Sequence, residues 1–287
     1  MAKIFEIKNL MFRYPQAKED VIKSISFDVE EGKIIGLLGP SGAGKSTTQK
    51  ILIKLLTDYQ GEILYRGSDL KSYSKSFYEE IGVGFEMPVH FNKLTALENL
   101  KYFSSLYQNK IDYLDLLKKV NLYDVKDQEV GQFSKGMKVR LNFVRALLNN
   151  PKMLFLDEPT NGLDPRNAKV MKDLILDYKK QGGTVFITTH LMADVEQLCD
   201  EVIFMTNGKI GEKSTPRELK IKYGKKEVKV EYNNDHTLHE KVFELNGLGH
   251  NGEFLELIKQ NNIETIHSGE TTLEDIFIKV TGEDHYE

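Results

Sequence analysis

The sequence contains a single cysteine, Cys199, and no long apolar run. One cysteine excludes a disulfide framework within the chain and fits a reducing, cytoplasmic compartment. In ADVEQLCD its apolar neighbours recur at helical spacing, so we expect a small buried side chain on a helix rather than a reactive thiol. The longest apolar runs, KIIGLLG and MLFL, fall far short of the roughly 20 residues that a membrane-spanning helix needs. Any role at a membrane therefore requires a partner protein.

A secretory signal and a surplus of basic residues are also lacking. The N-terminal segment KIFEIKNLMF alternates apolar and polar residues like a strand, unlike a signal peptide. Lys and Arg number 39 against 43 Asp and Glu, which gives a formal net charge of −4. Because duplex binding usually needs a basic face, we expect no nucleic acid as the main partner. The length of 287 residues suits one large domain and a small one.

Apolar runs that alternate with helical patterns predict an α/β fold with a mostly parallel core sheet. The candidate core strands cover residues 34–38, 153–156, 184–188 and 202–205. Residues 3–8 and 21–30 alternate apolar and polar, which predicts an antiparallel, half-exposed sheet near the N-terminus. Asn207 and Gly208, between two strand runs, predict a hairpin turn.

Residues 91 to about 150 predict a mainly helical insertion between two core strands. There Thr95 and Glu98 fit a capping box for a helix that runs through Tyr107, and residues 111–120 continue the helical pattern.

A domain boundary is expected at residue 215. Thr215, Pro216 and Glu218 fit an N-cap, a first-turn proline and a capping box. The strand-like KKEVKVEY and two short helical patterns follow, the second in TTLEDIFIKVTG. We therefore expect a large domain over residues 1–215 and a small accessory α/β domain over residues 216–287.

The segment GPSGAGKST matches G-x-x-x-x-G-K-[ST] and lies between an apolar strand and an amphipathic helix, where this phosphate-binding motif belongs. Its residues are Gly39, Pro40, Ser41, Gly42, Ala43, Gly44, Lys45, Ser46 and Thr47. The glycines let the loop turn with its N–H groups pointing inward, and the helix that begins near Lys45 adds its positive dipole end. Lys45 can reach the β- and γ-phosphates, and the Ser46 hydroxyl can ligate Mg²⁺. The motif alone fits kinases, GTPases, motors and transporter ATPases alike.

Two adjacent carboxylates, Asp157 and Glu158, end the apolar run MLFL. Ligands bind at the carboxyl ends of parallel strands, and a carboxylate leaving a buried strand is costly unless it acts on something. We expect Asp157 to hold the shell of Mg²⁺ and Glu158 to polarise the attacking water as general base.

His190 ends the strand run TVFITTH, and its position predicts a contact with the γ-phosphate. Whether it acts as a base or only as a hydrogen-bonding positioner stays open. In NGLDP, Asp164 and Pro165 predict the N-cap and first turn of a long amphipathic helix, and capping alone would explain Asp164.

The segment FSKGMKVRL, shortly before the acidic strand end, resembles the signature sequence of ATP-binding cassette (ABC) ATPases, usually L-S-G-G-Q. It keeps Ser134 and Gly136 but has Phe133, Lys135 and Met137 at the other positions. In order with GPSGAGKST, MLFLDEPT, NGLD and TTH, it makes residues 1 to about 215 resemble an ABC transporter ATP-binding protein.

That resemblance implies a P-loop NTPase cassette with a helical signature subdomain, and it implies roles for further residues. Tyr14 would stack on the adenine of ATP, unless it is an ordinary tyrosine at a strand end. Two cassettes would pair head to tail as a homodimer, with Ser134 and Gly136 pointing a helix N-terminus at the partner's γ-phosphate. Asp164 would lie at the same interface.

One position departs from the family. In IGVGFEMP, Glu86 stands where the family usually has glutamine. Its carboxylate could ligate Mg²⁺, or it could contact the permease without a catalytic role. Together with HFNKLTALENL and TTLEDIFIKVTG, this segment resembles the branch that serves multidrug, peptide and antibiotic exporters.

The resemblance thus implies an ATPase subunit that dimerises on ATP and drives a separate membrane permease from the inner face of the cell membrane. The alternative is a soluble ABC ATPase acting on ribosomes or DNA. Such proteins usually carry two cassettes, long coiled coils or cysteine-based zinc modules, none of which this sequence contains. A small-molecule kinase would not explain the signature segment.

Overall fold

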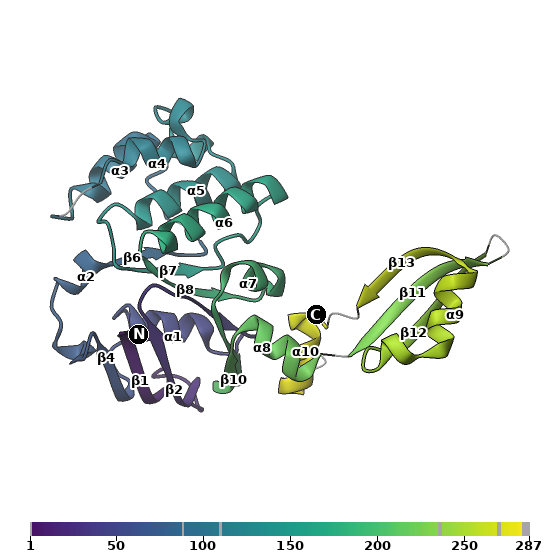
Figure 1. Cartoon of the computed structure of the whole chain (residues 1–287). Helices are drawn as coiled ribbons and strands as arrows, with labels where there is room; N and C mark the ends of the chain where they lie inside the picture. The colour runs from purple at the N-terminus through teal and green to yellow at the C-terminus, as the bar shows by residue number, and fades with distance from the viewer. Residues whose placement is uncertain are drawn as a thin grey trace. The chain divides into compact units, whose positions relative to one another are not determined.

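The computed structural model describes residues 2–87, 89–108, 111–224, 226–234, 237–268 and 271–282. These residues form two compact units that meet in the chain between Thr215 and Pro216 (Figure 1). Within the described ranges, no helix is long and apolar enough to cross a membrane.

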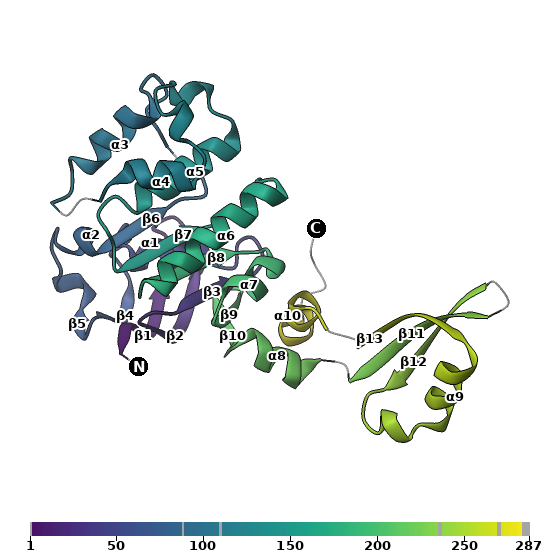
Figure 2. The same ribbon diagram turned by 45° about the horizontal axis from the view of Figure 1, so that its top comes forward.

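A six-stranded sheet forms the centre of the first unit, in the order β10-β9-β3-β8-β7-β6 (Figure 2). Its strands are β3 (Ile34–Leu38), β6 (Ile81–Gly84), β7 (Met153–Asp157), β8 (Thr184–Thr189), β9 (Glu201–Thr206) and β10 (Lys209–Ser214). All are parallel except β10, so the predicted parallel core is confirmed. Each of the four expected core strands lies within one residue of its predicted ends.

Strand β6 was not expected, because its run IGVG contains two glycines. The structure explains one of them: a Cβ on Gly82 would lie 2.0 Å from the Ala146 carbonyl oxygen. The close approach of helix α5 (Lys135–Ala146) to the sheet therefore requires glycine here.

A second, antiparallel sheet has the order β2-β1-β4-β5. Its strands are β1 (Lys3–Phe12), β2 (Ile22–Glu30), β4 (Gln60–Tyr65) and β5 (Ser68–Asp69). The expected pairing of the two N-terminal strands is confirmed, with Phe5 opposite Val29, whereas β4 and β5 were not expected.

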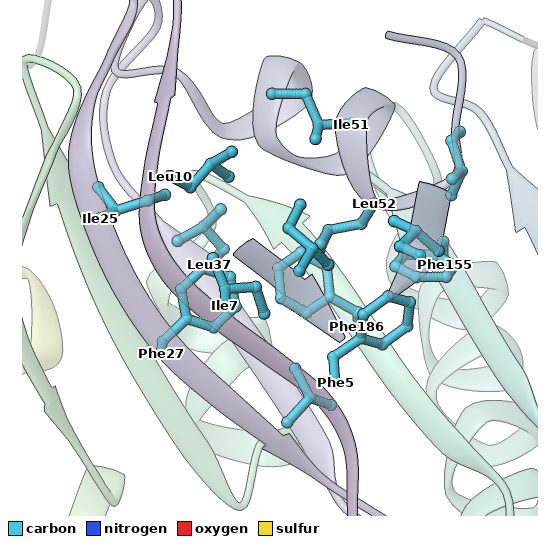
Figure 3. Packing of buried hydrophobic residues seen from close by; sticks show 14 of the residues in the cluster. Phe5, Ile7, Leu10, Ile25, Phe27, Leu37, Ile51, Leu52, Phe155 and Phe186 are labelled. Carbon is cyan, nitrogen blue, oxygen red and sulfur yellow. The ribbon is translucent and has the colours of Figure 1, made fainter. Parts of the chain in front are cut away.

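The main apolar core lies between the two sheets (Figure 3). The rings of Phe5 and Phe155 are 5.9 Å apart, and those of Phe27 and Phe186 are 6.1 Å apart. Helix α1 (Lys45–Leu52) adds Ile51 and Leu52 to this core, so the phosphate-loop helix is held between the sheets.

A second apolar cluster joins the core sheet to α5, α6 (Pro165–Lys180) and α7 (Met192–Leu198). Its members include Phe143, Met171, Ile175, Val185 and Leu198. Cys199 packs against this cluster but lies just after α7 in extended conformation, so its expected place on the helix is wrong by one residue. Burial raises the pKa of its thiol, as expected for a residue that packs rather than reacts.

The insertion between β6 and β7 is mainly helical, as predicted, with α3 (Ala96–Ser104), α4 (Tyr113–Lys119) and α5. The capping box of Thr95 and Glu98 is confirmed. Helix α3 ends at Ser104 rather than Tyr107, because the next N–H groups, including that of Tyr107, bond to carbonyls three residues back. A short helix, α2 (Phe77–Glu80), precedes β6.

The hairpin between β9 and β10 is also confirmed. Asn207 and Gly208 have φ angles of 47° and 77°, the left-handed pair of a type I′ turn. The Gly208 N–H donates to the Ala43 carbonyl at 3.0 Å, so the turn supports the phosphate loop from behind.

The second unit begins with α8 (Pro216–Tyr223), at the expected proline, and ends with α10 (Leu273–Thr281). Between them lie β11 (Glu227–Asn234), β12 (Thr237–Glu244), α9 (Gly252–Gln260) and β13 (Asn262–Ser268), with sheet order β12-β11-β13. The core of this sheet and α9 consists of Val228, Val230, Phe243 and Leu257. Only β11 was expected as a strand, since most residues of β12 and β13 are exposed or half-exposed and their sequences do not alternate clearly.

Candidate active site

The phosphate loop, residues 39–47, connects β3 to α1. A Cβ on Gly39 would lie 2.0 Å from the Met205 carbonyl oxygen, so this position admits only glycine. Gly42 and Gly44 have φ angles of 82° and 109°, which residues other than glycine rarely adopt. Helix α1 begins at Lys45, as expected.

The Lys45 side chain lies inside this loop and is buried. Its Nζ donates to the carbonyl oxygens of Gly39 and Pro40 at 2.7 and 3.0 Å. Burial lowers the pKa of Lys45, and the negative charges of Glu158 and Asp157 act in the opposite direction. No ion pair of Lys45 occurs among the described residues, and a bound phosphate would supply an anionic partner at hydrogen-bond distance.

Asp157 ends β7, and strand register places it opposite Thr188 of β8. The Thr188 Oγ1 donates to Asp157 Oδ1 at 2.5 Å, and the Ser46 Oγ lies 3.5 Å from the same oxygen. Burial raises the pKa of Asp157, against the hydrogen bond from Thr188. The predicted pair of Ser46 and Asp157 is therefore adjacent in space.

Glu158 follows in a left-handed conformation, with a φ angle of 47°. Its Oε1 accepts hydrogen bonds from the backbone N–H and the Nδ1 of His190, at 3.1 and 2.8 Å. Its Oε2 accepts from the Thr189 hydroxyl at 2.8 Å. The two expected catalytic residues thus form a direct pair, and Thr189 is a third member that the sequence did not indicate.

These segments converge on one pocket of about 450 Å³. It is lined by Val21, Ser41, Gly42, Gly44, Lys45, Ser46, Thr47, Glu86, Glu158 and His190. All of these except Val21 were expected from the sequence. Val21 precedes β2 and carries no motif, so nothing in the sequence distinguished it.

The oxygen atoms at this pocket suit Mg²⁺, which prefers carboxylate, hydroxyl and water oxygens. Ser46 and Glu86 line the pocket and supply such atoms. Asp157 is not among the described lining residues, but its Oδ1 lies 3.5 Å from the Ser46 Oγ. The described residues contain no group of three or more His, Cys, Asp or Glu placed to hold a metal. A magnesium ion here would take further oxygen ligands from nucleotide phosphates and water, as in phosphoryl-transfer sites.

Tyr14 lies beside the phosphate-loop helix, and its hydroxyl is 3.3 Å from Thr47 Oγ1. Its ring packs edge-on against Phe12, with the ring centroids 4.9 Å apart. Tyr14 is thus close to the pocket without being among its described lining residues.

Ser134 and Asp164 are the N-caps of α5 and α6. The Ser134 hydroxyl accepts from the Met137 N–H at 3.2 Å, and Asp164 accepts from the Asn167 N–H at 3.0 Å. Hydrogen bonds from Asn167 lower the pKa of Asp164. Gly136 lies on the first turn of α5. None of these three expected site residues is among the described residues that line the pocket of their own phosphate loop.

Glu86 lies on the segment after β6, and Asn161 Nδ2 donates to its Oε1 at 3.1 Å. Side chains of the signature helix α5 hold this segment: Asn142 Nδ2 donates to the Phe85 carbonyl at 2.9 Å. Arg145 donates to the Val89 carbonyl at 2.5 Å. These two residues were missed, because their role depends on the contact between a loop and a helix far along the chain.

Comparison with known proteins agrees with this geometry. A family model described as ABC transporter matches residues 22–161, and one described as fluoroquinolone efflux ABC transporter C-terminal domain matches residues 226–270. A fluoroquinolones export ATP-binding protein of Mycobacterium tuberculosis is 46% identical over 282 residues, covering 98% of this chain and 94% of the relative. The chain belongs to the ABC transporter ATP-binding proteins.

Two further relatives support the assignment. The bacitracin transport ATP-binding protein of Bacillus licheniformis is 34% identical, covering 98% of both chains. A solved ATP-binding subunit of an ABC transporter is 29% identical with a TM-score of 0.70, covering 77% of this chain and 93% of its own. The expected P-loop NTPase cassette fold is thereby confirmed.

The expected activity is confirmed as well. The chain is an ATP-binding subunit of the exporter type, and it hydrolyses ATP in a reaction coupled to transport. The alternative, an ABC ATPase acting on ribosomes or DNA, is disfavoured, since the relatives named above are export and transport proteins. ABC ATP-binding subunits dimerise and work with membrane permeases.

Proposed function

We propose that two copies of this chain close head to tail around two ATP molecules and reopen after hydrolysis, driving a permease at the inner face of the membrane. The observation that carries this proposal is that Lys45, Glu158 and His190, from three separate segments, line one pocket. The pocket combines a cation for phosphate oxygens, a carboxylate for the attacking water and an imidazole beside it.

In this proposal the phosphates occupy the loop of residues 39–47 at the N-terminus of α1. The inward N–H groups and the helix dipole favour anionic oxygens. Lys45 exchanges the carbonyls of Gly39 and Pro40 for the β- and γ-phosphates. Tyr14, close to Thr47, then stacks on the adenine.

Glu158 acts as the general base on the attacking water, and His190 acts as a positioning residue. The bond from His190 Nδ1 to Glu158 supports this division of roles. It leaves only the Nε2 of the imidazole ring to contact the nucleotide.

Mg²⁺ would be held by Ser46 and Asp157 with phosphate and water oxygens. When bound, this cation offsets the negative charge on the phosphate oxygens during transfer. Thr188 orients the Asp157 carboxylate through their 2.5 Å hydrogen bond. Glu86 lines the same pocket, and its charge raises the pKa of Asp157, which supports a place in the field of the metal.

Ser134 and Gly136 would serve the nucleotide of the second copy, and Asp164 would lie at the same interface. The position of Ser134 and Gly136 at the N-terminus of α5 supports this role, because a helix start offers free N–H donors to a phosphate. The large unit, residues 1–215, would be the ATPase domain, and residues 216–287 a small accessory domain.

The permease would contact the segment after β6 and the neighbouring face of α3. Large apolar side chains are exposed there: Phe85, Met87, Val89, Phe91, Tyr102 and Leu106. The Phe91 and Tyr102 rings are 5.1 Å apart, so the loop and the helix share one apolar surface. An exposed patch of this kind favours a protein partner.

We further propose that the exported compound is an antibiotic of the fluoroquinolone type. The 46% identity to the mycobacterial export protein extends over both units, and the C-terminal match to the efflux family covers residues 226–270. The compound itself would bind the permease, because the pocket of this chain is built for phosphates.

Glu158→Gln tests the ATPase mechanism. Removing a general base costs about 10²- to 10⁴-fold in rate, so this variant should bind ATP and hydrolyse it very slowly. Two copies should then remain closed and elute as a dimer in size-exclusion chromatography with Mg²⁺ and ATP. Lys45→Ala is the matched control and should stay monomeric. An ATP-loaded Glu158→Gln protein that stays monomeric would contradict head-to-tail closure.

Fluoroquinolone accumulation in cells tests the substrate. Cells lacking this chain should accumulate the drug, and expression of the chain should restore efflux. Expression of the Lys45→Ala variant should not restore efflux. Equal accumulation in all three strains would reject a fluoroquinolone as the exported compound.

A further inference from the structure

Thr189 is the last residue of β8 and is 2% exposed. Side chains alternate along a strand, so Thr188 and Thr189 point to opposite faces of β8. Thr188 bonds to Asp157, and Thr189 bonds to Glu158 at 2.8 Å. Two successive threonines thus hold the two successive carboxylates of the neighbouring strand end.

The direction of the Thr189 hydrogen bond follows from its second partner. The Leu191 N–H donates to the Thr189 Oγ1 at 3.0 Å, so the hydroxyl must accept there. A hydroxyl has one proton, and an ionised carboxylate only accepts. The Thr189 proton is therefore directed to Glu158 Oε2.

The two oxygens of Glu158 are held from different sides of the carboxylate. Oε1 takes both hydrogen bonds of His190, whereas Oε2 has Thr189 as its donor. The Glu158 side chain is nearly buried, at 8% exposure, so water cannot readily replace a lost donor. Loss of the Thr189 hydroxyl would leave Oε2 without this donor, and the two bonds from His190 would then hold the carboxylate through Oε1 alone, so that it could turn about that oxygen.

Thr189 does not touch the nucleotide pocket. It is absent from the described residues that line it, and lies instead in a small internal space with Thr160, Asp194 and Val195. Among the described contacts, the bond to Glu158 links the Thr189 hydroxyl to a side chain of the site, and its second bond, from the Leu191 N–H, lies in the backbone next to His190.

We propose that Thr189 is a positioning residue for ATP hydrolysis, whose hydroxyl sets the orientation of the Glu158 carboxylate toward the attacking water. This inference rests on the proposed role of Glu158 as general base. A base must lie within hydrogen-bond reach of the proton that it removes. Rotation of the Glu158 carboxylate should therefore lower the rate of hydrolysis without weakening ATP binding.

Thr189→Val tests the inference, because valine has the shape of threonine without the hydroxyl. We expect kcat for ATP to fall by about 10- to 100-fold, the range for one hydrogen bond to a charged group, with KM unchanged. Thr189→Ser, which restores the hydroxyl, should recover most of kcat. Thermal unfolding of each variant shows that the protein remains folded.

Two further proteins complete the experiment. Thr184→Val is the matched control at the other end of β8, where the Thr184 hydroxyl accepts from the Gly32 N–H at 2.9 Å, and it should keep normal kcat. In a Glu158→Gln background, Thr189→Val should lower the residual rate no further, because the carboxylate that it orients is gone.

The outcomes separate this inference from the proposed function. Normal hydrolysis by Glu158→Gln would overturn the role of Glu158 and the inference with it. A slow Glu158→Gln protein beside a normal Thr189→Val protein would overturn the inference alone. It would also fail if serine did not recover the rate, if only KM changed, if Thr184→Val were equally slow, or if Thr189→Val slowed Glu158→Gln further.

Discussion

His90 makes the stability of the first unit depend on pH. It lies on the segment after β6 and is 9% exposed. Its Nε2 bonds to the Lys138 carbonyl of α5 at 3.1 Å, and its Nδ1 has no partner among the described residues. Burial and the positive charge of Arg145 lower the pKa of His90 from 6.5 to about 4.

The sign and size of the effect follow from this shift. Between pH 6.5 and about 4, His90 is protonated in the unfolded state but stays neutral in the folded state. The free energy of unfolding therefore falls as pH falls. At 1.36 kcal/mol per pKa unit, the full loss is about 3 kcal/mol, and about 2 kcal/mol of it is reached at pH 5. Above pH 6.5 this contribution to stability is fully present.

The assay is urea denaturation at pH 7.5 and pH 5.0, followed by far-UV circular dichroism because the chain has no tryptophan. His90→Gln keeps an N–H donor for the Lys138 carbonyl but takes up no proton. Its loss of stability between the two pH values should be about 2 kcal/mol smaller than that of the natural protein. His250→Gln, at an exposed position of the second unit, is the control and should lose as much as the natural protein. Equal losses in His90→Gln and the natural protein would refute the argument.

Three further substitutions test the site. Lys45→Ala should weaken ATP binding by about 10- to 100-fold, the size of a lost charged hydrogen bond, and abolish turnover; normal ATPase activity would reject the phosphate loop. Glu86→Gln should change the Mg²⁺ concentration for half-maximal ATPase activity if the carboxylate lies in the field of the metal. An unchanged requirement, with transport lost in cells, would leave Glu86 as a permease contact. Ser134→Arg should bind ATP normally as a monomer but neither dimerise nor hydrolyse it, and dimerisation with ATP would contradict the head-to-tail model.

Local patterns were sufficient wherever the chemistry of neighbouring residues decides the structure. The phosphate loop is one case, since its glycines, lysine and following helix are all required within one short segment. The hairpin at Asn207 and Gly208 is another, because only a few residues tolerate two successive left-handed conformations. Four of the core strands were located nearly to the residue, since strands buried on both faces are continuously apolar.

The sequence was a poor guide where packing against distant segments decides. β6 is a core strand despite its two glycines, because Gly82 lies against the Ala146 carbonyl of α5. β12 and β13 form by pairing with β11, although their own residues are mostly exposed or half-exposed.

The sequence by itself determined which chemistry to expect of this protein, because the phosphate loop, the two carboxylates and the histidine are groups suited to ATP hydrolysis. Only the tertiary structure decided which of these residues contact one another and through which hydrogen bonds. Glu158 lies 32 residues from His190 and 31 from Thr189 in the chain, and the parallel register of β7 and β8 brings them within hydrogen-bond distance. A motif indicates what a side chain can bind. The neighbour that orients this side chain from the next strand depends on strand pairing, and strand pairing cannot be derived from the spacing of residues within one segment.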